Sequence, residues 1–175
     1  MRIAGIDNGK DGAIVVLDGG SVLSRIIMPT IDIKGGKREF DLPGIVQVFK
    51  AGSVDHAFVE RAQAMPAQGV SSTFSIGHGF GLICGVLAAL QIPTSIVRPQ
   101  TWQGVMFRDM GKSDTKALSM LIAGRHWPKV DWRATVRCKN LHDGLTDAAC
   151  IAEYGRRLIE IPEVVANAVP AGGAA

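Results

Sequence analysis

The chain has 175 residues, of which 47% are hydrophobic and 20% charged, and this composition excludes an intrinsically disordered protein. Its length is sufficient for one domain with a hydrophobic core. The formal net charge of +3 permits a polyanionic partner without requiring one.

Cysteine usage and hydropathy indicate the compartment. Three cysteines without paired or metal-binding spacing are typical of a reducing environment. The first residues lack the pattern of a signal peptide, and the longest apolar run, at about 79–92, is shorter than the roughly 20 residues that span a bilayer. We expect a cytoplasmic protein without a membrane partner.

The first part of the chain predicts a meander of strands over residues 3–6, 13–17 and 21–28, because each run is apolar and rich in β-branched side chains. Residues 31–40 are interpreted as a flexible loop, since their Lys-Gly-Gly-Lys-Arg run is typical of a solvated segment. An amphipathic pattern predicts a short helix over 42–51.

Strands then alternate with helices. Strands are predicted over residues 55–60 and 94–97, and helices over 71–90, 100–106, 114–126 and 143–159. Ser71 or Ser72 is predicted to cap the first of these helices, and Ser113 the third. This order predicts an α/β fold with a mixed sheet covered by helices, in one domain over residues 1–160 with a disordered tail over 161–175.

The helix predicted at 71–90 carries two stripes. An inward apolar stripe is formed by Ile76, Phe80, Ile83, Leu87 and Leu90. A second stripe of small residues is formed by Gly77, Gly81, Gly85 and Ala88. Because each glycine costs a helix about 1 kcal/mol relative to alanine, we interpret the small stripe as close packing within the core. A dimer contact is the alternative.

Four carboxylates occupy related positions. Asp7 and Glu60 each end a predicted strand, while Asp143 and Asp147 lie four residues apart on one face of the last helix. Turn capping by Asp7 and a helix-dipole role for Asp143 are the alternatives. Oxygen ligands without His or Cys favour Mg²⁺ or Mn²⁺. Two such ions about 3.5–4 Å apart would suit phosphodiester hydrolysis.

A resemblance to a known family is carried by three segments: Gly-Ile-Asp-Asn-Gly around Asp7, Glu-Arg-Ala-Gln-Ala-Met-Pro-Ala-Gln-Gly-Val-Ser-Ser-Thr-Phe at 60–74, and Asp-Gly-Leu-Thr-Asp-Ala-Ala-Cys-Ile-Ala-Glu-Tyr-Gly-Arg-Arg at 143–157. They resemble the RuvC family of Holliday-junction resolvases in the RNase H-like superfamily, and phage-type RuvC-like nucleases in particular. The resemblance covers about residues 1–160. It implies a five-stranded mixed sheet flanked by helices, a homodimer, a four-way DNA junction as substrate in DNA recombination and repair, and a bacterial or phage-infected host cytoplasm.

The same resemblance implies the roles of the acids. Asp7 would bridge two Mg²⁺ ions, Glu60 and Asp147 would be outer ligands, and Asp143 would complete the site. A metal-bound water would attack the phosphorus in line and leave 5′-phosphate and 3′-hydroxyl ends. Lys116 matches a basic residue that bacterial relatives carry near the scissile phosphate; a solvated helix lysine is the alternative.

The sequence departs from the bacterial family in two respects. The last two acids are spaced by four residues instead of three, which leaves open whether Asp143 is a direct ligand. A second active-site lysine of the family would fall near Trp102 and Gln103, and neither is basic. Its charge is either missing or supplied by Arg98, Arg108 or Lys112.

The loop after Glu60 is expected to contact DNA. Arg61, Gln63 and Gln68 are suited to phosphates or sugars. Met65 is suited to insertion between bases at an opened junction, with loop packing as the alternative. Lys112 and Lys116 complete the predicted DNA-binding set.

Three other functions remain open. An RNase H-type nuclease acting on RNA–DNA hybrids would share the metal chemistry. An actin-like or sugar-kinase-type enzyme begins with a similar Gly-Ile-Asp segment, but such enzymes need two lobes, and the chain contains no P-loop motif. A structural DNA-junction binder without catalysis is the third.

Overall fold

A five-stranded mixed sheet forms the centre of the protein in the computed structural model, which describes residues 1–63, 69–111 and 114–162. Its strand order is β3-β2-β1-β6-β7. The strands are β1 (Arg2–Asp7), β2 (Ala13–Asp18), β3 (Ser21–Ile27), β6 (His56–Glu60) and β7 (Thr94–Val97). β1, β2 and β3 pair antiparallel, whereas β6 runs parallel to both β1 and β7. The predicted α/β architecture is therefore confirmed.

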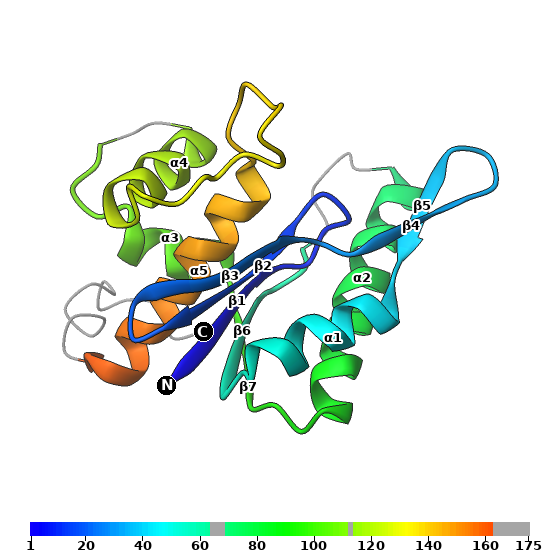
Figure 1. Ribbon diagram of the computed structural model, residues 1–175, viewed down its shortest axis with the longest axis horizontal. Coiled ribbons are helices and arrows are strands. Elements are labelled where there is room, and N and C mark those ends of the chain that lie inside the picture. Colours follow the sequence, from blue (N-terminus) through cyan, green and yellow to red (C-terminus); the bar gives the residue numbers. More distant parts are fainter. Residues whose placement is uncertain (64–68, 112–113, 163–175) are drawn as a thin grey trace.

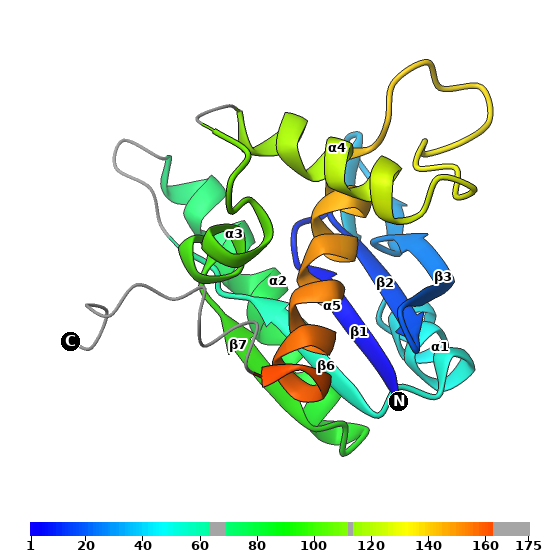
Figure 2. The ribbon, with the colours of Figure 1, turned by 90° about the vertical axis from the view of Figure 1, so that its left-hand side faces the viewer.

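Helices cover both faces of this sheet (Figures 1 and 2). One face carries α3 (Pro99–Met106), α4 (Thr115–His126) and α5 (Asp143–Glu160), and the other carries α1 (Leu42–Gly52) and α2 (Val70–Ala89). Alternation along β1 supplies both cores: Ile3 packs in the cluster with α5, whereas Ala4 and Ile6 pack in the cluster with α1 and α2.

α5 lies directly on the backbone of β1. A Cβ atom added to Gly5 would lie 2.1 Å from the carbonyl oxygen of Ala148, so only glycine allows this approach. Gly144 is similarly tight, since its added Cβ would lie 2.7 Å from the carbonyl oxygen of Asp11. These two contacts hold the N-terminus of α5 against the turn that follows Asp7.

Residues 31–40 were expected to form a flexible loop, and this prediction is wrong. They form most of an antiparallel hairpin of β4 (Thr30–Ile33) and β5 (Lys37–Phe40), separate from the main sheet and projecting from it (Figure 1). Gly35 and Gly36 adopt φ values of +89° and +70°, a left-handed conformation that allows a tight hairpin turn. The basic run thus lies at the tip of an ordered ribbon.

α2 differs from its predicted form in two ways. The helix begins at Val70 after Gly69, so neither Ser71 nor Ser72 is its N-cap. The four small residues are exposed, and a Cβ added to Gly77, Gly81 or Gly85 would meet no atom within 4 Å. Their interpretation as core packing is therefore wrong, because residues 1–63, 69–111 and 114–162 supply no partner for this stripe.

The inward stripe of α2 is confirmed at its centre. Ile83 and Leu87 are fully buried, and Phe80 and Leu90 pack partly buried against the same cluster. α2 is 20 residues long with a mean hydropathy of 1.4, and by length and composition alone it passes the test for a membrane-spanning helix. That is weak support for a span, since other classes of helix pass the same test.

The remaining helix boundaries agree closely with those predicted. α4 begins at Thr115 after Asp114, and the predicted cap Ser113 lies outside the described residues. α5 ends at Glu160, one residue beyond its predicted end, and positions 163–175 of the predicted tail also lie outside the described residues.

Candidate active site

Strand alternation brings Asp7 and Glu60 to the same face of the sheet. In β1 the odd-numbered Ile3 faces α5, so Asp7 at the strand end faces α5 as well. In β6 Phe58 faces α5, and Glu60 two residues later does the same. Because β1 and β6 are neighbouring parallel strands, the two carboxylates lie close enough to interact electrostatically.

The other two acids come from the start of α5. His142 is its N-cap, and its Nδ1 accepts a hydrogen bond from the Leu145 N–H across 3.3 Å, which agrees with a structural role for this histidine. Asp143 and Asp147 lie one turn apart on α5, and each interacts electrostatically with Asp7. The sheet and the helix therefore converge on one group of acids.

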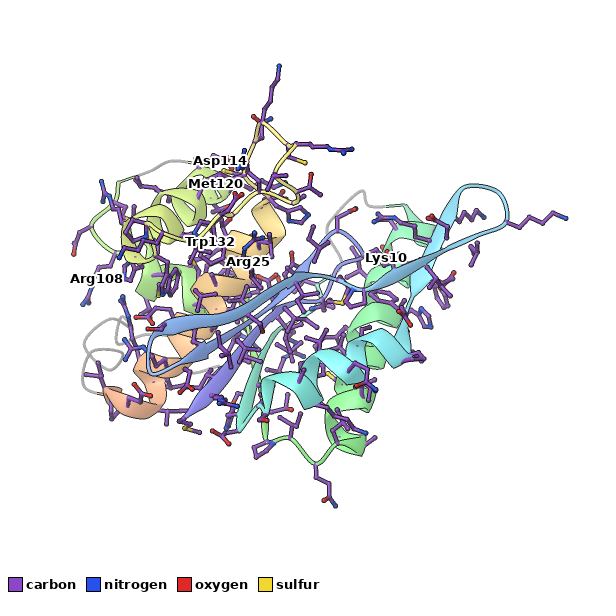
Figure 3. All side chains as sticks on the ribbon, in the orientation of Figure 1. Lys10, Arg25, Arg108, Asp114, Met120 and Trp132 are labelled. Atoms are coloured by element: carbon purple, nitrogen blue, oxygen red, sulfur yellow. The ribbon has the colours of Figure 1, made fainter. Side chains whose placement is uncertain are left out.

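These side chains line an open pocket of about 420 Å³. One side is acidic and is formed by Asp7, Asp143 and Asp147, with Lys116 beside them. The remaining lining residues are Gly9, Lys10, Asp11, Gly12, Arg38, Ser72, Ser75 and Ile76. In Figure 3, Lys10 is labelled at the base of the β4–β5 hairpin, so cations and carboxylates face the same space.

Glu60 lies beside this pocket and not in its lining. Its Oε1 accepts a hydrogen bond from the indole Nε1–H of Trp102 across 3.0 Å, and Trp102 is only 1% exposed. The buried side chain of Asn8 adds a second link, because its Nδ2 donates to the backbone carbonyl of Glu60. Asn8 thus ties the end of β1 to the end of β6, and Trp102 ties β6 to α3; neither contact was predicted.

Burial and mutual repulsion shift the pKa values of the acids. Desolvation, together with repulsion from the neighbouring carboxylates, raises the pKa of Glu60 to about 7 and that of Asp147 to about 6. Desolvation also raises the pKa of Asp7. The hydrogen bond from Lys116 lowers the pKa of Asp143. Three of the four carboxylates therefore lie in an environment that disfavours their charge.

Lys116 forms an ion pair between its Nζ and Oδ2 of Asp143. Its side chain is 62% exposed, yet it lines the acidic side of the pocket. This position is compatible with the predicted role of Lys116 as a cation near a bound phosphate. Asp143 is the acid that this cation neutralises, which distinguishes it from the other three.

The donor set fits a hard divalent cation, because it consists of carboxylate oxygens whose repulsion a cation would relieve. Within the described residues, no group of three or more His, Cys, Asp or Glu side chains already converges as a preformed metal site. Two of the four acids instead have partners in the protein: Glu60 is hydrogen-bonded to Trp102, and Asp143 is paired with Lys116.

The predicted DNA-binding residues are only partly described. Arg61 is exposed and Gln63 half-buried in the segment after β6. Met65, Gln68 and Lys112 lie outside the described residues. Neither Arg98 nor Arg108 is among the described residues that line the pocket, whereas Lys10 and Arg38 are, although neither had been assigned to the site.

No family model and no curated protein matches this sequence. Among solved structures, Thermus thermophilus RuvC in complex with a Holliday junction substrate aligns with a TM-score of 0.62 at 13% identity, over 92% of this chain and 96% of that one. A second Thermus thermophilus RuvC structure aligns at 0.56 with 16% identity, over 93% and 97%. The yeast mitochondrial Holliday junction resolvase Ydc2 aligns at 0.52 with 11% identity, over 95% and 84%. The chain therefore has the RuvC-like fold of these proteins.

Proposed function

We propose that this protein is a metal-dependent endonuclease that cuts Holliday junctions or related branched DNA. The observation that carries the proposal is the convergence of Asp7, Asp143, Asp147 and Lys116 on one open pocket, with Glu60 beside it. A cluster of carboxylates with raised pKa values is costly unless it serves chemistry, and such clusters mark functional sites. The solved structures of the same fold support junction DNA as the substrate.

Asp7, Glu60, Asp143 and Asp147 would hold two Mg²⁺ ions, with Mn²⁺ as a substitute. When bound, the metal would polarise the scissile phosphate and neutralise the charge that develops on its oxygens. Trp102 would orient Glu60 through its indole N–H. Lys116 lies where its ammonium group would stabilise the same phosphate. Water would attack the phosphorus and the bond between phosphorus and the 3′ oxygen would break, which would leave 5′-phosphate and 3′-hydroxyl ends.

A homodimer would place two such sites on opposed strands of one junction. The exposed small-residue stripe of α2 supports this assembly, because residues without bulky side chains allow two helices to approach closely. Beside it lies an apolar groove of about 290 Å³ between α1 and α2, whose lining includes Leu42, Val46 and Leu82. At the start of α2, Phe74 is 72% exposed. A second copy of the chain would cover this apolar surface.

The proposal is tested by comparing cleavage of a four-way junction, a linear duplex and an RNA–DNA hybrid, in Mg²⁺ and in EDTA. We expect paired nicks on the junction only, and only with metal. Asp7→Asn should abolish cutting and retain binding. Asp18→Asn is a matched control, because Asp18 is exposed and pairs with Arg2 away from the pocket lining.

Each other result would point elsewhere. Cleavage of the hybrid alone would indicate an RNase H-type nuclease. Junction binding without cutting would favour a structural binder. Stabilisation by nucleotides, with no effect of branched DNA, would favour an actin-like or kinase-type enzyme. An active Asp7→Asn variant would refute the site assignment.

A further inference from the structure

The β4–β5 hairpin is fixed at one end and exposed at the other. At its base, Phe40 is 7% exposed and packs in the core, where a Cβ added to Gly79 of α2 would lie 2.5 Å from its ring. Lys10 Nζ lies 5.7 Å from the centre of the Phe40 ring. Residues 31–38 are all exposed. The hairpin is therefore a ribbon with a firmly held base and a free tip.

The middle of β5 is joined to the turn that follows Asp7. Lys10 Nζ donates to the carbonyl oxygen of Arg38, and Arg38 Nη2 pairs with Oδ1 of Asp11 across 2.6 Å. Lys10 and Arg38 line the same pocket as the acids. The Arg38–Asp11 pair is solvent-accessible, with side-chain exposures of 41% and 86%, and such pairs contribute little to stability. Arg38 can therefore exchange Asp11 for a phosphate at small cost.

Two further cations lie at the tip. Lys34 and Lys37 flank Gly35 and Gly36, and within the described part of the chain neither pairs with an acid. Lys37 directly precedes Arg38 in β5, and Ile33, the residue before Lys34, pairs with Lys37 across the hairpin. The cations of the hairpin thus form a group that extends from the pocket to the hairpin tip.

A group of cations that begins beside a cluster of carboxylates and extends away from it is suited to an extended polyanion. The carboxylates repel such a ligand, so a neighbouring positive surface is needed to hold it next to them. A chain of successive phosphates is long enough to contact the cations at the pocket and those at the hairpin tip together. A compact anion would engage the pocket residues and leave Lys34 and Lys37 without a role.

We infer that the β4–β5 hairpin is a DNA-binding arm: Arg38 and Lys10 contact the backbone next to the cleaved phosphate, and Lys34 and Lys37 contact phosphates farther along the same junction arm. The inference rests on the proposed function in one respect, namely that the ligand of the pocket is nucleic acid. It assigns a substrate contact to a segment that carries none of the metal-binding acids.

The test uses the full chain with Asp7→Asn, so that the junction is bound and not cut. Adding K34A/K37A should weaken junction binding about tenfold near 0.1 M salt. It should also reduce the slope of log K against log salt by about 1.8, since each lost phosphate contact contributes about 0.9. Hydroxyl-radical footprinting should show lost protection on one arm, beyond the nucleotides next to the cut site.

The control is K50A/R125A, which removes two exposed positive charges from α1 and α4 and therefore has the same net charge as K34A/K37A. We expect its salt slope and footprint to match the parent protein. An unchanged slope and footprint for K34A/K37A, with the parent still binding the junction, would overturn the inference and leave the proposed function standing. A parent protein that binds no branched DNA would refute both.

Discussion

The indole N–H of Trp102 donates to Oε1 of Glu60 across 3.0 Å, and this contact occupies one oxygen of a carboxylate predicted to bind metal. Trp102 is fully buried, so its orientation is set by core packing. The residue lies where the resemblance to bacterial resolvases would have placed a lysine. A neutral donor from the core takes that position and fixes the rotamer of Glu60.

Replacing Trp102 with phenylalanine should weaken metal binding. The loss of an outer-shell hydrogen bond typically lowers metal affinity 10- to 100-fold. The pKa of Glu60 should also rise, because the Trp102 hydrogen bond lowers it. Mn²⁺ titration and the pH profile of cleavage measure the two effects. The control is Trp127→Phe, which removes an indole hydrogen bond to the Gly20 carbonyl instead; equal losses in both variants would indicate general destabilisation.

Lys116→Met should reduce the cleavage rate by roughly 100-fold or more, as expected when one donor to a developing charge is removed. The exposed Lys116 makes no core contact, so stability should change little. The pKa of Asp143 should rise towards its ordinary value, because the Lys116 hydrogen bond holds it down. Single-turnover cleavage measures the first effect and NMR titration of Asp143 the second. An unchanged rate would return Lys116 to the role of a solvated helix lysine.

Without metal, the protein should lose stability between about pH 4.5 and pH 7.5. Glu60 and Asp147 have raised pKa values in the folded state, about 7 and about 6, so folding favours their protonated forms. Their stabilising effect is complete below the unfolded pKa values and is lost as pH rises through the folded ones. Each pKa unit corresponds to about 1.4 kcal/mol, so a change of a few kcal/mol is expected.

Thermal unfolding in EDTA across this range, repeated with excess Mg²⁺, measures the effect. Excess Mg²⁺ should reduce the loss of stability with rising pH, because it binds the ionised carboxylates. Glu60→Gln should also reduce it, whereas Glu39→Gln at the exposed base of the hairpin should not. Stability that rises with pH in EDTA would contradict the assigned pKa shifts.

In the proposed homodimer, Gly81→Leu should shift the equilibrium from dimer to monomer. A Cβ at Gly81 meets no atom of the described residues within 4 Å, so the substitution tests the stripe without disturbing the fold. Sedimentation velocity gives the mass, and circular dichroism confirms folding. Gly124→Leu on α4, which is equally open, is the control. An unchanged mass for Gly81→Leu would show that the stripe is not part of a dimer interface.

Much of the site could be predicted from local patterns. A strand alternates its side chains between two faces, so the ends of β1 and β6 could be identified as places where Asp7 and Glu60 emerge beside a core. The four-residue spacing of Asp143 and Asp147 requires that they share a face of α5. Such features depend only on the periodicity of one strand or one helix, which the local sequence determines.

Other features were decided only by the tertiary structure. The tip residues of the β4–β5 hairpin have a loop-like composition, and their order depends on Phe40 packing into a core formed by distant residues. The small stripe of α2 is exposed because Ile83 and Leu87 direct the opposite side of the helix inward. The contact between Trp102 and Glu60 joins separate elements. The sequence by itself determined which chemical groups emerge at each strand end and helix face, whereas long-range packing decided which of them meet.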